Sequence, residues 1–245
     1  MQFAAEMLVH YPVQAAKLGV SVTELNDLLA AAAAVRLPYN EEKRIHEQDD
    51  EAFMKPVWPF ETTPKDHYPL LLHYHPLTIY RYQVNKQADT LLADYLFPDD
   101  LDQAQLKREY DYYEKITTHD SSLSRSVFSA LATRIEQPEK AYQYFMDTAK
   151  VDLIDLQGNA ADGLHVANLG GSWLSIVTGF GGVRLKNQQL VIDNHLPAAW
   201  QSLTIRIQFQ QRLLEIVYQH QHTEVSLLTG EPLTINVDGT MTQVG

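Results

Sequence analysis

Leu203-Thr-Ile-Arg-Ile-Gln-Phe209 is the stretch that decides the fold, because apolar and polar residues alternate strictly along it. An alternation with period two predicts a strand with one buried and one exposed face. Further short strands, separated by polar or glycine-containing turns, are expected at residues 190–193, 212–218, 223–228 and 233–237. The region from about residue 184 to the end is therefore predicted to be a small antiparallel sheet module.

Upstream of this region the pattern is helical. Helices are predicted at residues 1–10, 21–35, 77–97, 101–116, 127–135 and 139–150. Their short connections leave little room for strands, which favours helices packed in antiparallel pairs. Between them, residues 39–69 interleave prolines with aromatic residues and predict a long ordered loop. We expect a mostly α chain followed by β, with domains at 1–183 and 184–245.

The composition narrows the function classes. The net charge is −12 and the pI is near 5.2, so the basic surface that nucleic acids or anionic membranes require is missing. No cysteine is present, which excludes disulfides and thiolate metal sites. The start of the chain has no basic leader, and the longest apolar run (28–35) is too short to span a bilayer. We expect a soluble, cytoplasmic protein.

The first candidate site is Thr117–Ser124, a cluster of hydroxyls with one imidazole at the predicted opening of a helix. The first turn of a helix presents unpaired N–H groups and the positive end of the helix dipole, and it attracts anions. Asp120 and Ser121 are equally suited to cap the helix without binding anything. From these residues alone, both interpretations stay open.

Two further stretches carry polar side chains of chemical interest. Lys86 and Gln87 offer a point charge and an amide, a combination that suits sugar hydroxyls but also fits a solvated helix face. His165 can contact a phosphate or be structural. No two of the ten histidines have the helical spacing of a zinc hydrolase, so no metal site is predicted. Gly179-Phe-Gly-Gly182 lacks the spacing and the lysine of a phosphate loop.

Four motifs, in order along the chain, resemble glycoside hydrolase family 65. They are His73-Tyr-His-Pro-Leu77 running into Val84–Asp89, then Thr118–Ser124, then Asp162-Gly-Leu-His165, and then Gly170-Gly-Ser-Trp173. The best-known members of this family are inverting disaccharide phosphorylases. The resemblance implies that the chain forms the last helices of an (α/α)6 barrel followed by a small C-terminal antiparallel β-sandwich.

The resemblance also implies roles for individual residues. Lys86 and Gln87 would contact glucose, whereas His119, Ser121, Ser122 and His165 would hold phosphate. The general acid is a glutamate expected upstream of Met1, so we expect the chain alone to be inactive.

Maltose is the expected disaccharide. Inorganic phosphate is the co-substrate, and no cofactor is expected. The expected protein partner is a second copy, or the missing N-terminal part of the same enzyme.

Three alternatives stay open. The family includes phosphorylases for trehalose and kojibiose. An inverting glycosidase of the same family would use Asp120 as a base. A carbohydrate-binding module would keep the sugar and phosphate contacts without catalysis.

Overall fold

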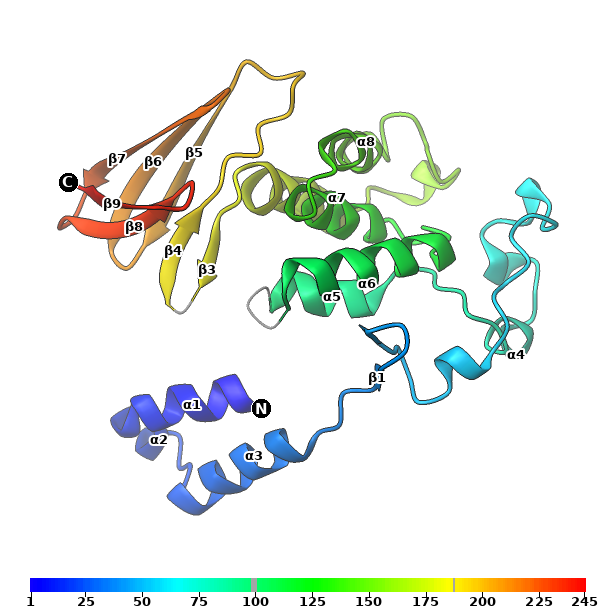
Figure 1. Cartoon of the computed structure of the whole chain (residues 1–245), viewed down its shortest axis with the longest axis horizontal. Coiled ribbons are helices and arrows are strands. Elements are labelled where there is room, and N and C mark those ends of the chain that lie inside the picture. The colour runs from blue at the N-terminus through cyan, green and yellow to red at the C-terminus, as the bar shows by residue number, and fades with distance from the viewer. Residues whose placement is uncertain (98–100, 187) are drawn as a thin grey trace. The chain divides into compact units, whose positions relative to one another are not determined.

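The computed structural model describes residues 1–97, 101–186 and 188–245 (Figure 1). The chain divides into two compact units, Met1–Tyr39 and Asn40–Gly245. The sequence did not predict a division at Tyr39. The boundary expected between residues 183 and 184 stays a prediction.

The N-terminal unit consists of three helices, α1 (Gln2–His10), α2 (Pro12–Lys17) and α3 (Val22–Ala34). Ser21 caps α3, because its hydroxyl accepts a hydrogen bond from the backbone N–H of Glu24 at 3.2 Å. Pro12 starts α2, where its missing N–H is not needed. α1 packs against both other helices.

The boundary between the units falls inside β1 (Tyr39–Asn40), and the second unit opens with an irregular segment that has its own small core. The elements of this segment are β2 (Ile45–His46), η1 (Ala52–Met54), η2 (Lys65–His67), η3 (Leu70–Leu72) and α4 (Pro76–Ile79). The Trp58 ring meets the rings of Tyr74 and Tyr82 edge to face, each at 5.0 Å between centroids. Its indole N–H donates to Thr63 at 2.8 Å. Aromatic packing therefore orders this proline-rich segment.

One predicted helix is wrong. Residues 77–97 do not form a single helix, because α4 ends at Ile79 and α5 (Asp89–Leu96) starts ten residues later. From Gln83 on, the backbone bonds to distant segments instead of to its own preceding turn. Gln83 N–H donates to Pro56 C=O at 2.9 Å, and Asn85 N–H donates to Ile116 C=O at 2.8 Å. Lys86 and Gln87 thus lie on a loop and not on a helix face.

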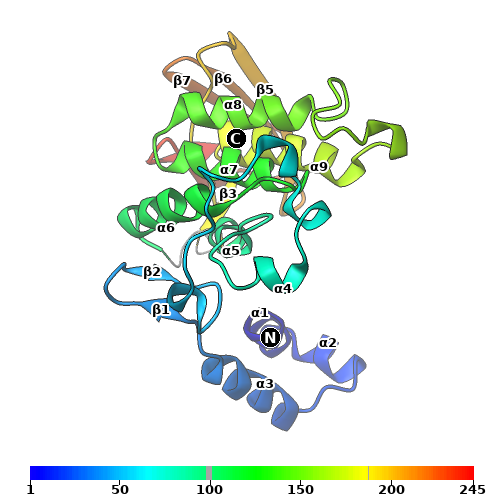
Figure 2. The same ribbon diagram turned by 90° about the vertical axis from the view of Figure 1, so that its right-hand side faces the viewer.

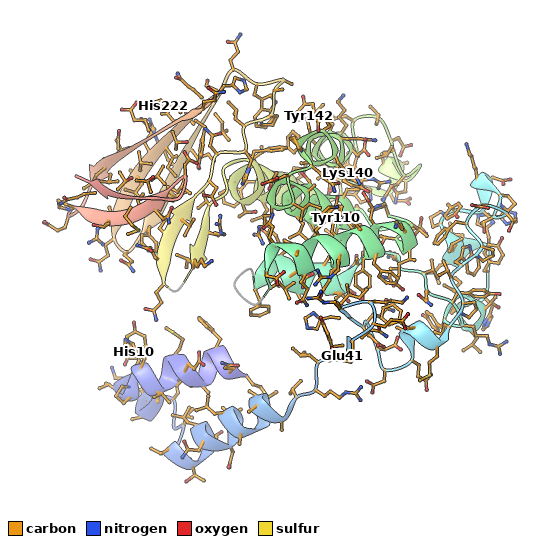
Figure 3. All side chains as sticks on the ribbon, viewed as in Figure 1. His10, Glu41, Tyr110, Lys140, Tyr142 and His222 are labelled. Carbon is orange, nitrogen blue, oxygen red and sulfur yellow. The ribbon has the colours of Figure 1, made fainter. Side chains whose placement is uncertain are left out.

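The main helical layer follows. It contains α5, α6 (Gln103–Ile116), α7 (Ser124–Arg134), α8 (Pro138–Ala149), η4 (Ala160–Asp162) and α9 (Val166–Leu174), which continues as the π-helical turn η5 (Ser175–Phe180). α7 contacts α5, α6, α8 and α9, so it is the central helix (Figure 2). Tyr110 and Phe128 are fully buried in the core of this helical layer. The Lys140 ammonium lies over the Tyr110 ring (Figure 3).

The C-terminal part forms two small sheets. Their strands are β3 (Arg184–Lys186), β4 (Gln189–Ile192), β5 (Ser202–Phe209), β6 (Arg212–Gln219), β7 (His222–Thr229), β8 (Leu233–Val237) and β9 (Thr240–Val244). One sheet has the order β3-β4-β8-β9 and the other β5-β6-β7. Buried Ile192, Ile216 and Ile235 belong to one core that both sheets share.

The change from helix to strand and the position of the sheets confirm the predicted order of elements. The predicted all-antiparallel pairing is wrong at one place, because β4 and β8 pair in parallel, Val191 opposite Asn236. Periodicity shows which residues form a strand, but it does not say which strand becomes its neighbour.

Candidate functional site

The first turns of α5, α7 and α9 line a single pocket of about 310 Å³. Gln87 and Asp89 come from the start of α5, Leu123 and Ser124 from the start of α7, and Ala167 from the start of α9. The other lining residues continue along the same helices: Ala88, Leu92, Tyr95, Ser126, Val127, Ala130, Gly170, Gly171 and Leu174. Three segments that the sequence had marked separately therefore meet at one place.

The segment before α5 is fixed to the segment before α7. The backbone of buried Asn85 accepts from Thr118 N–H at 2.8 Å, and Thr118 Oγ1 donates to the same carbonyl at 3.3 Å. Gln87 is half-buried, and its side-chain amide donates to Asp89 at 2.9 Å. Lys86 is exposed. Of the six residues predicted to bind sugar or phosphate, Gln87 is the one that lines the pocket.

His119 is held firmly inside the turn that precedes α7. Its Nδ1 lies 2.9 Å from Ser124 Oγ, and its Nε2 lies 3.2 Å from the Tyr144 hydroxyl. Burial, together with the positive charge of Arg125, lowers the pKa of His119 from 6.5 to about 4. The ring is therefore neutral at pH 7, and both of its nitrogens have partners.

The backbone of His119 is also unusual, with φ at 57° in the left-handed region. Histidine adopts this region more often than most residues, but it remains sparsely populated. The Arg125 guanidinium donates to the His119 carbonyl at 3.1 Å and stabilises the turn. His119 therefore shapes the turn.

Ser121 and Ser122 differ in what they contact. Ser121 is buried, and its hydroxyl accepts from Leu123 N–H at 3.3 Å, which is a local capping bond. Ser122 is half-buried. Asp120 accepts from the backbone N–H of Leu70 at 3.2 Å and so fixes the preceding loop. This contact gives Asp120 a structural role.

His165 lies directly before α9, and Asp152 holds it at two points. Asp152 Oδ1 lies 2.6 Å from His165 Nδ1, and Asp152 Oδ2 accepts from the His165 backbone N–H at 3.0 Å. These hydrogen bonds lower the pKa of Asp152 below its usual range. A carboxylate on Nδ1 fixes the imidazole orientation and leaves Nε2 for another partner. The sequence did not reveal Asp152, because it lies thirteen positions before His165.

The paired glycines of α9 have different surroundings. A Cβ on Gly171 would lie 2.7 Å from Ser126 Oγ and 2.9 Å from Ser126 Cβ, whereas a Cβ on Gly170 would meet nothing within 4 Å. Ser175 Oγ adds a hydrogen bond of 3.2 Å to the Ser126 carbonyl. The absence of a side chain at Gly171 lets α9 approach α7 and thereby brings their first turns together.

The pocket is mostly apolar along α5, α7 and α9, and its polar groups come from the starts of α5 and α7. Leu92, Val127 and Leu174 supply apolar surface, while Gln87, Asp89 and Ser124 supply polar groups. The predicted binding of an anion at the starts of these helices stays a prediction. In the part of the chain that the structure describes, no helix has the length and apolar character needed to cross a membrane.

Two domain models of one family match the chain. Residues 1–174 match the glycosyl hydrolase family 65 central catalytic domain, and residues 183–244 match the C-terminal domain of the same family. An alpha,alpha-trehalose phosphorylase of Geobacillus stearothermophilus is 50% identical over 91% of this chain and 29% of its own length. A maltose phosphorylase of Bacillus subtilis is 34% identical over 82% of this chain and 26% of its own length.

A solved structure gives the same result. A protein from the human microbiome, assigned as a kojibiose phosphorylase, superposes with a TM-score of 0.84 at 30% identity. The match covers 94% of this chain and 31% of that protein. The chain thus spans less than a third of the length of these relatives, and it belongs to glycosyl hydrolase family 65.

Proposed function

We propose that this chain is the C-terminal part of an inverting disaccharide phosphorylase. In this proposal α5 to α9 are the last helices of an (α/α)6 barrel, and the two sheets form the C-terminal domain. The alternation of helices around the central α7 supports the barrel assignment. The cytoplasmic location and a homodimer stay predictions from the sequence.

The proposed disaccharide is trehalose. The expectation of maltose has no support, because the maltose phosphorylase is 34% identical to the chain and the trehalose phosphorylase is 50% identical. A second trehalose phosphorylase, from Thermoanaerobacter brockii, is 41% identical over 92% of the chain.

The proposed roles follow the three helix starts. Lys86 and Gln87 bind the glucosyl group, and Ser122 and His165 hold phosphate. Ser121 stabilises the turn that carries Ser122. His119 is proposed to position this turn, since Ser124 and Tyr144 occupy both of its ring nitrogens. Phosphate attacks the anomeric carbon on the face opposite to the leaving sugar, where an inverting hydrolase would hold a water. The acid that protonates the leaving oxygen comes from outside these 245 residues, and no cofactor takes part.

The observation that carries the proposal is the convergence of the starts of α5, α7 and α9 at one pocket. Each start bears one of the segments that the family resemblance assigned to sugar or phosphate. Hydroxyls and helix N–H groups suit a phosphate better than a hydrolytic water, which would need a carboxylate base. The contact of Asp120 with Leu70 argues against Asp120 as that base.

A chimera tests the proposal. This chain replaces the corresponding C-terminal part of the Geobacillus trehalose phosphorylase, and the products from trehalose, maltose and kojibiose are measured with and without phosphate. We expect phosphate-dependent release of glucose and β-glucose 1-phosphate from trehalose. Phosphate-independent glucose release would indicate a glycosidase. Sugar binding without any turnover in a folded chimera would indicate a carbohydrate-binding module.

A further inference from the structure

Three side chains with metal-ligating atoms meet away from the pocket, where β2, α5 and α6 come together. They are His46 on β2, Asp94 on α5 and Glu109 on α6, and one ligand atom of each lies within 4.8 Å of the other two. Because the three residues are far apart in the sequence, their spacing gave no signal of a metal site. The fold brings them together.

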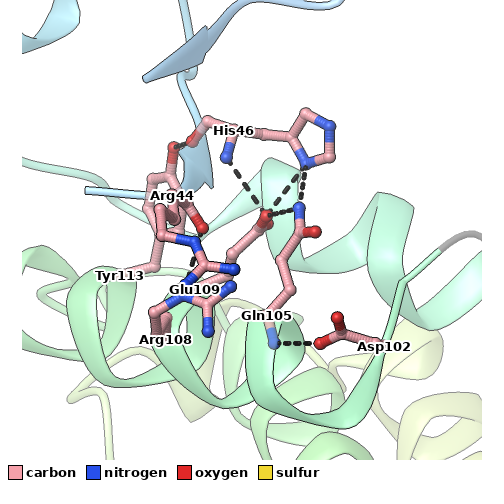
Figure 4. A network of polar contacts seen from close by, with 7 residues as sticks. All are labelled: Arg44, His46, Asp102, Gln105, Arg108, Glu109 and Tyr113. Atoms are coloured by element: carbon pink, nitrogen blue, oxygen red, sulfur yellow. Dashed lines mark hydrogen bonds and ion pairs between the residues drawn. The ribbon is translucent and has the colours of Figure 1, made fainter. Parts of the chain in front are cut away.

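Glu109 is fully buried, and its two oxygens have different surroundings. Oε1 accepts from the backbone N–H of His46 at 3.1 Å and from the Gln105 amide at 2.9 Å, and it lies 2.9 Å from His46 Nδ1 (Figure 4). Oε2 is buried and has no hydrogen-bond donor among the residues that the structure describes. A buried carboxylate oxygen without a partner is costly and calls for an explanation.

Asp94 repeats this feature. It is 7% exposed, and its Oδ2 is buried without a donor within the described ranges. The Asp94 carboxylate lies beside that of Glu109, with a ligand oxygen of each within 4.8 Å of the other. Two carboxylates this close in the interior need a bound cation or a shared proton to offset their repulsion.

We propose that His46, Asp94 and Glu109 bind a divalent transition-metal ion, Zn²⁺ or Mn²⁺. One imidazole nitrogen with two carboxylate oxygens suits these ions, whereas Mg²⁺ and Ca²⁺ take oxygen ligands almost exclusively. Oε2 of Glu109 and Oδ2 of Asp94 are the oxygens assigned to the metal, because neither accepts a hydrogen bond from the described residues. Oε1 keeps its bonds to the His46 backbone and to Gln105, which would hold the Glu109 carboxylate in place.

The geometry is compatible with such an ion after a small adjustment. Ligand atoms around tetrahedral zinc lie roughly 3.4 Å apart, as follows from metal–ligand bonds of about 2.1 Å. One ligand atom of each residue already lies within 4.8 Å of the other two, so a small movement of the side chains would bring the three groups to this spacing. The Tyr113 hydroxyl donates to the His46 carbonyl at 2.6 Å and holds β2 beside α6. The ion would join β2, α5 and α6, which is a structural role.

Metal binding to the full chain tests the inference. After treatment with EDTA, the chain is dialysed against Zn²⁺ or Mn²⁺, the bound metal is counted by mass spectrometry and the Tm is measured. We expect one ion per chain and a higher Tm, because a ligand that binds the folded state stabilises it. Asp94→Asn, which keeps the side-chain shape, should weaken binding by more than about tenfold and remove the rise in Tm.

The matched control is His67→Gln. The rings of His67 and His73 stack at 5.0 Å, which makes them a competing pair of imidazoles for adventitious metal. His67→Gln should keep the ion. Loss of the ion in His67→Gln, or its retention in folded Asp94→Asn, would overturn the inference. So would an absence of saturable binding, which would mean that the carboxylates share a proton instead.

A measurement on the unmodified sequence covers the case in which the variant does not fold. The EPR spectrum of bound Mn²⁺ should show coupling to one histidine nitrogen, and labelling histidine with ¹⁵N should change that coupling. Saturable Mn²⁺ without histidine coupling would contradict the assignment of His46.

Discussion

Replacing Gly171 by alanine should push α9 away from α7. The added Cβ would lie 2.7 Å from Ser126 Oγ and 2.9 Å from Ser126 Cβ. The hydroxyl can rotate if it gives up its 3.1 Å bond to the Leu123 carbonyl, but Cβ moves only with the backbone of α7. Gly170→Ala is the matched control, because nothing lies within 4 Å of its Cβ position.

The two variants should change the free energy of unfolding in opposite directions. Alanine in place of glycine inside a helix stabilises by about 0.5–1 kcal/mol, and Gly170→Ala should show this gain. Overpacking costs about 1–3 kcal/mol, so Gly171→Ala should lower the free energy of unfolding by roughly 0.5–2 kcal/mol after the same gain is included. The difference between the two variants isolates the contact and should be about 1–3 kcal/mol.

Urea unfolding of both variants at equal concentration measures this difference. Ser126→Gly removes both clashing atoms, so adding Gly171→Ala to it should no longer destabilise. Equal free energies of unfolding for Gly170→Ala and Gly171→Ala would refute the reasoning. An unchanged cost in the Ser126→Gly background would also refute it, because the clash would then lie elsewhere.

Three further predictions concern the site. His119 binds a proton near pH 6.5 in the unfolded chain but only near pH 4 in the folded chain, so the free energy of unfolding should rise by about 3 kcal/mol from pH 4 to 7. Urea unfolding of His119→Gln should show a flatter dependence of this free energy on pH, and the same pH dependence in both proteins would contradict the prediction. Gln87→Ala in the chimera should raise the KM for trehalose roughly tenfold with little effect on the KM for phosphate, and the reverse pattern would move Gln87 to the phosphate side. Asp152→Asn should raise the KM for phosphate by about threefold to tenfold, because the His165 imidazole would no longer be oriented correctly. The ¹⁵N chemical shifts of the His165 imidazole should change in the same variant, and unchanged shifts would contradict the role of Asp152 in orienting it.

Much of the secondary structure follows from local pattern. The alternation at 203–209 corresponds to β5, and the helices expected at 101–116 and 139–150 correspond to α6 and α8. These elements are long and strongly periodic, and their hydrogen bonds lie within a helix or between neighbouring strands. Local periodicity is then sufficient.

The errors occur where distant segments compete with local structure. The expected helix through Lys86 fails because Asn85 bonds to Ile116 and Thr118. The parallel pairing of β4 with β8 depends on which strands become neighbours, and periodicity does not encode that.

The candidate site shows the same limit. Residue type alone identified Gln87, His119 and His165 as candidates. Only the fold shows that Ser124 and Tyr144 contact the two ring nitrogens of His119, and that Asp152 orients His165. Likewise, His46, Asp94 and Glu109 come together only in the tertiary structure. Contacts between residues far apart in sequence cannot be read from spacing.

The central claim is that the starts of α7 and α9 hold the phosphate that attacks the sugar. The KM for phosphate of the chimera carrying His165→Gln tests it most directly, with His222→Gln on the exposed start of β7 as the control. Loss of a hydrogen bond to a charged group costs about 1.5–3 kcal/mol, so the KM for phosphate should rise by roughly 10–100-fold while the KM for trehalose stays within about twofold. A KM for phosphate equal to that of the His222→Gln control would contradict the account.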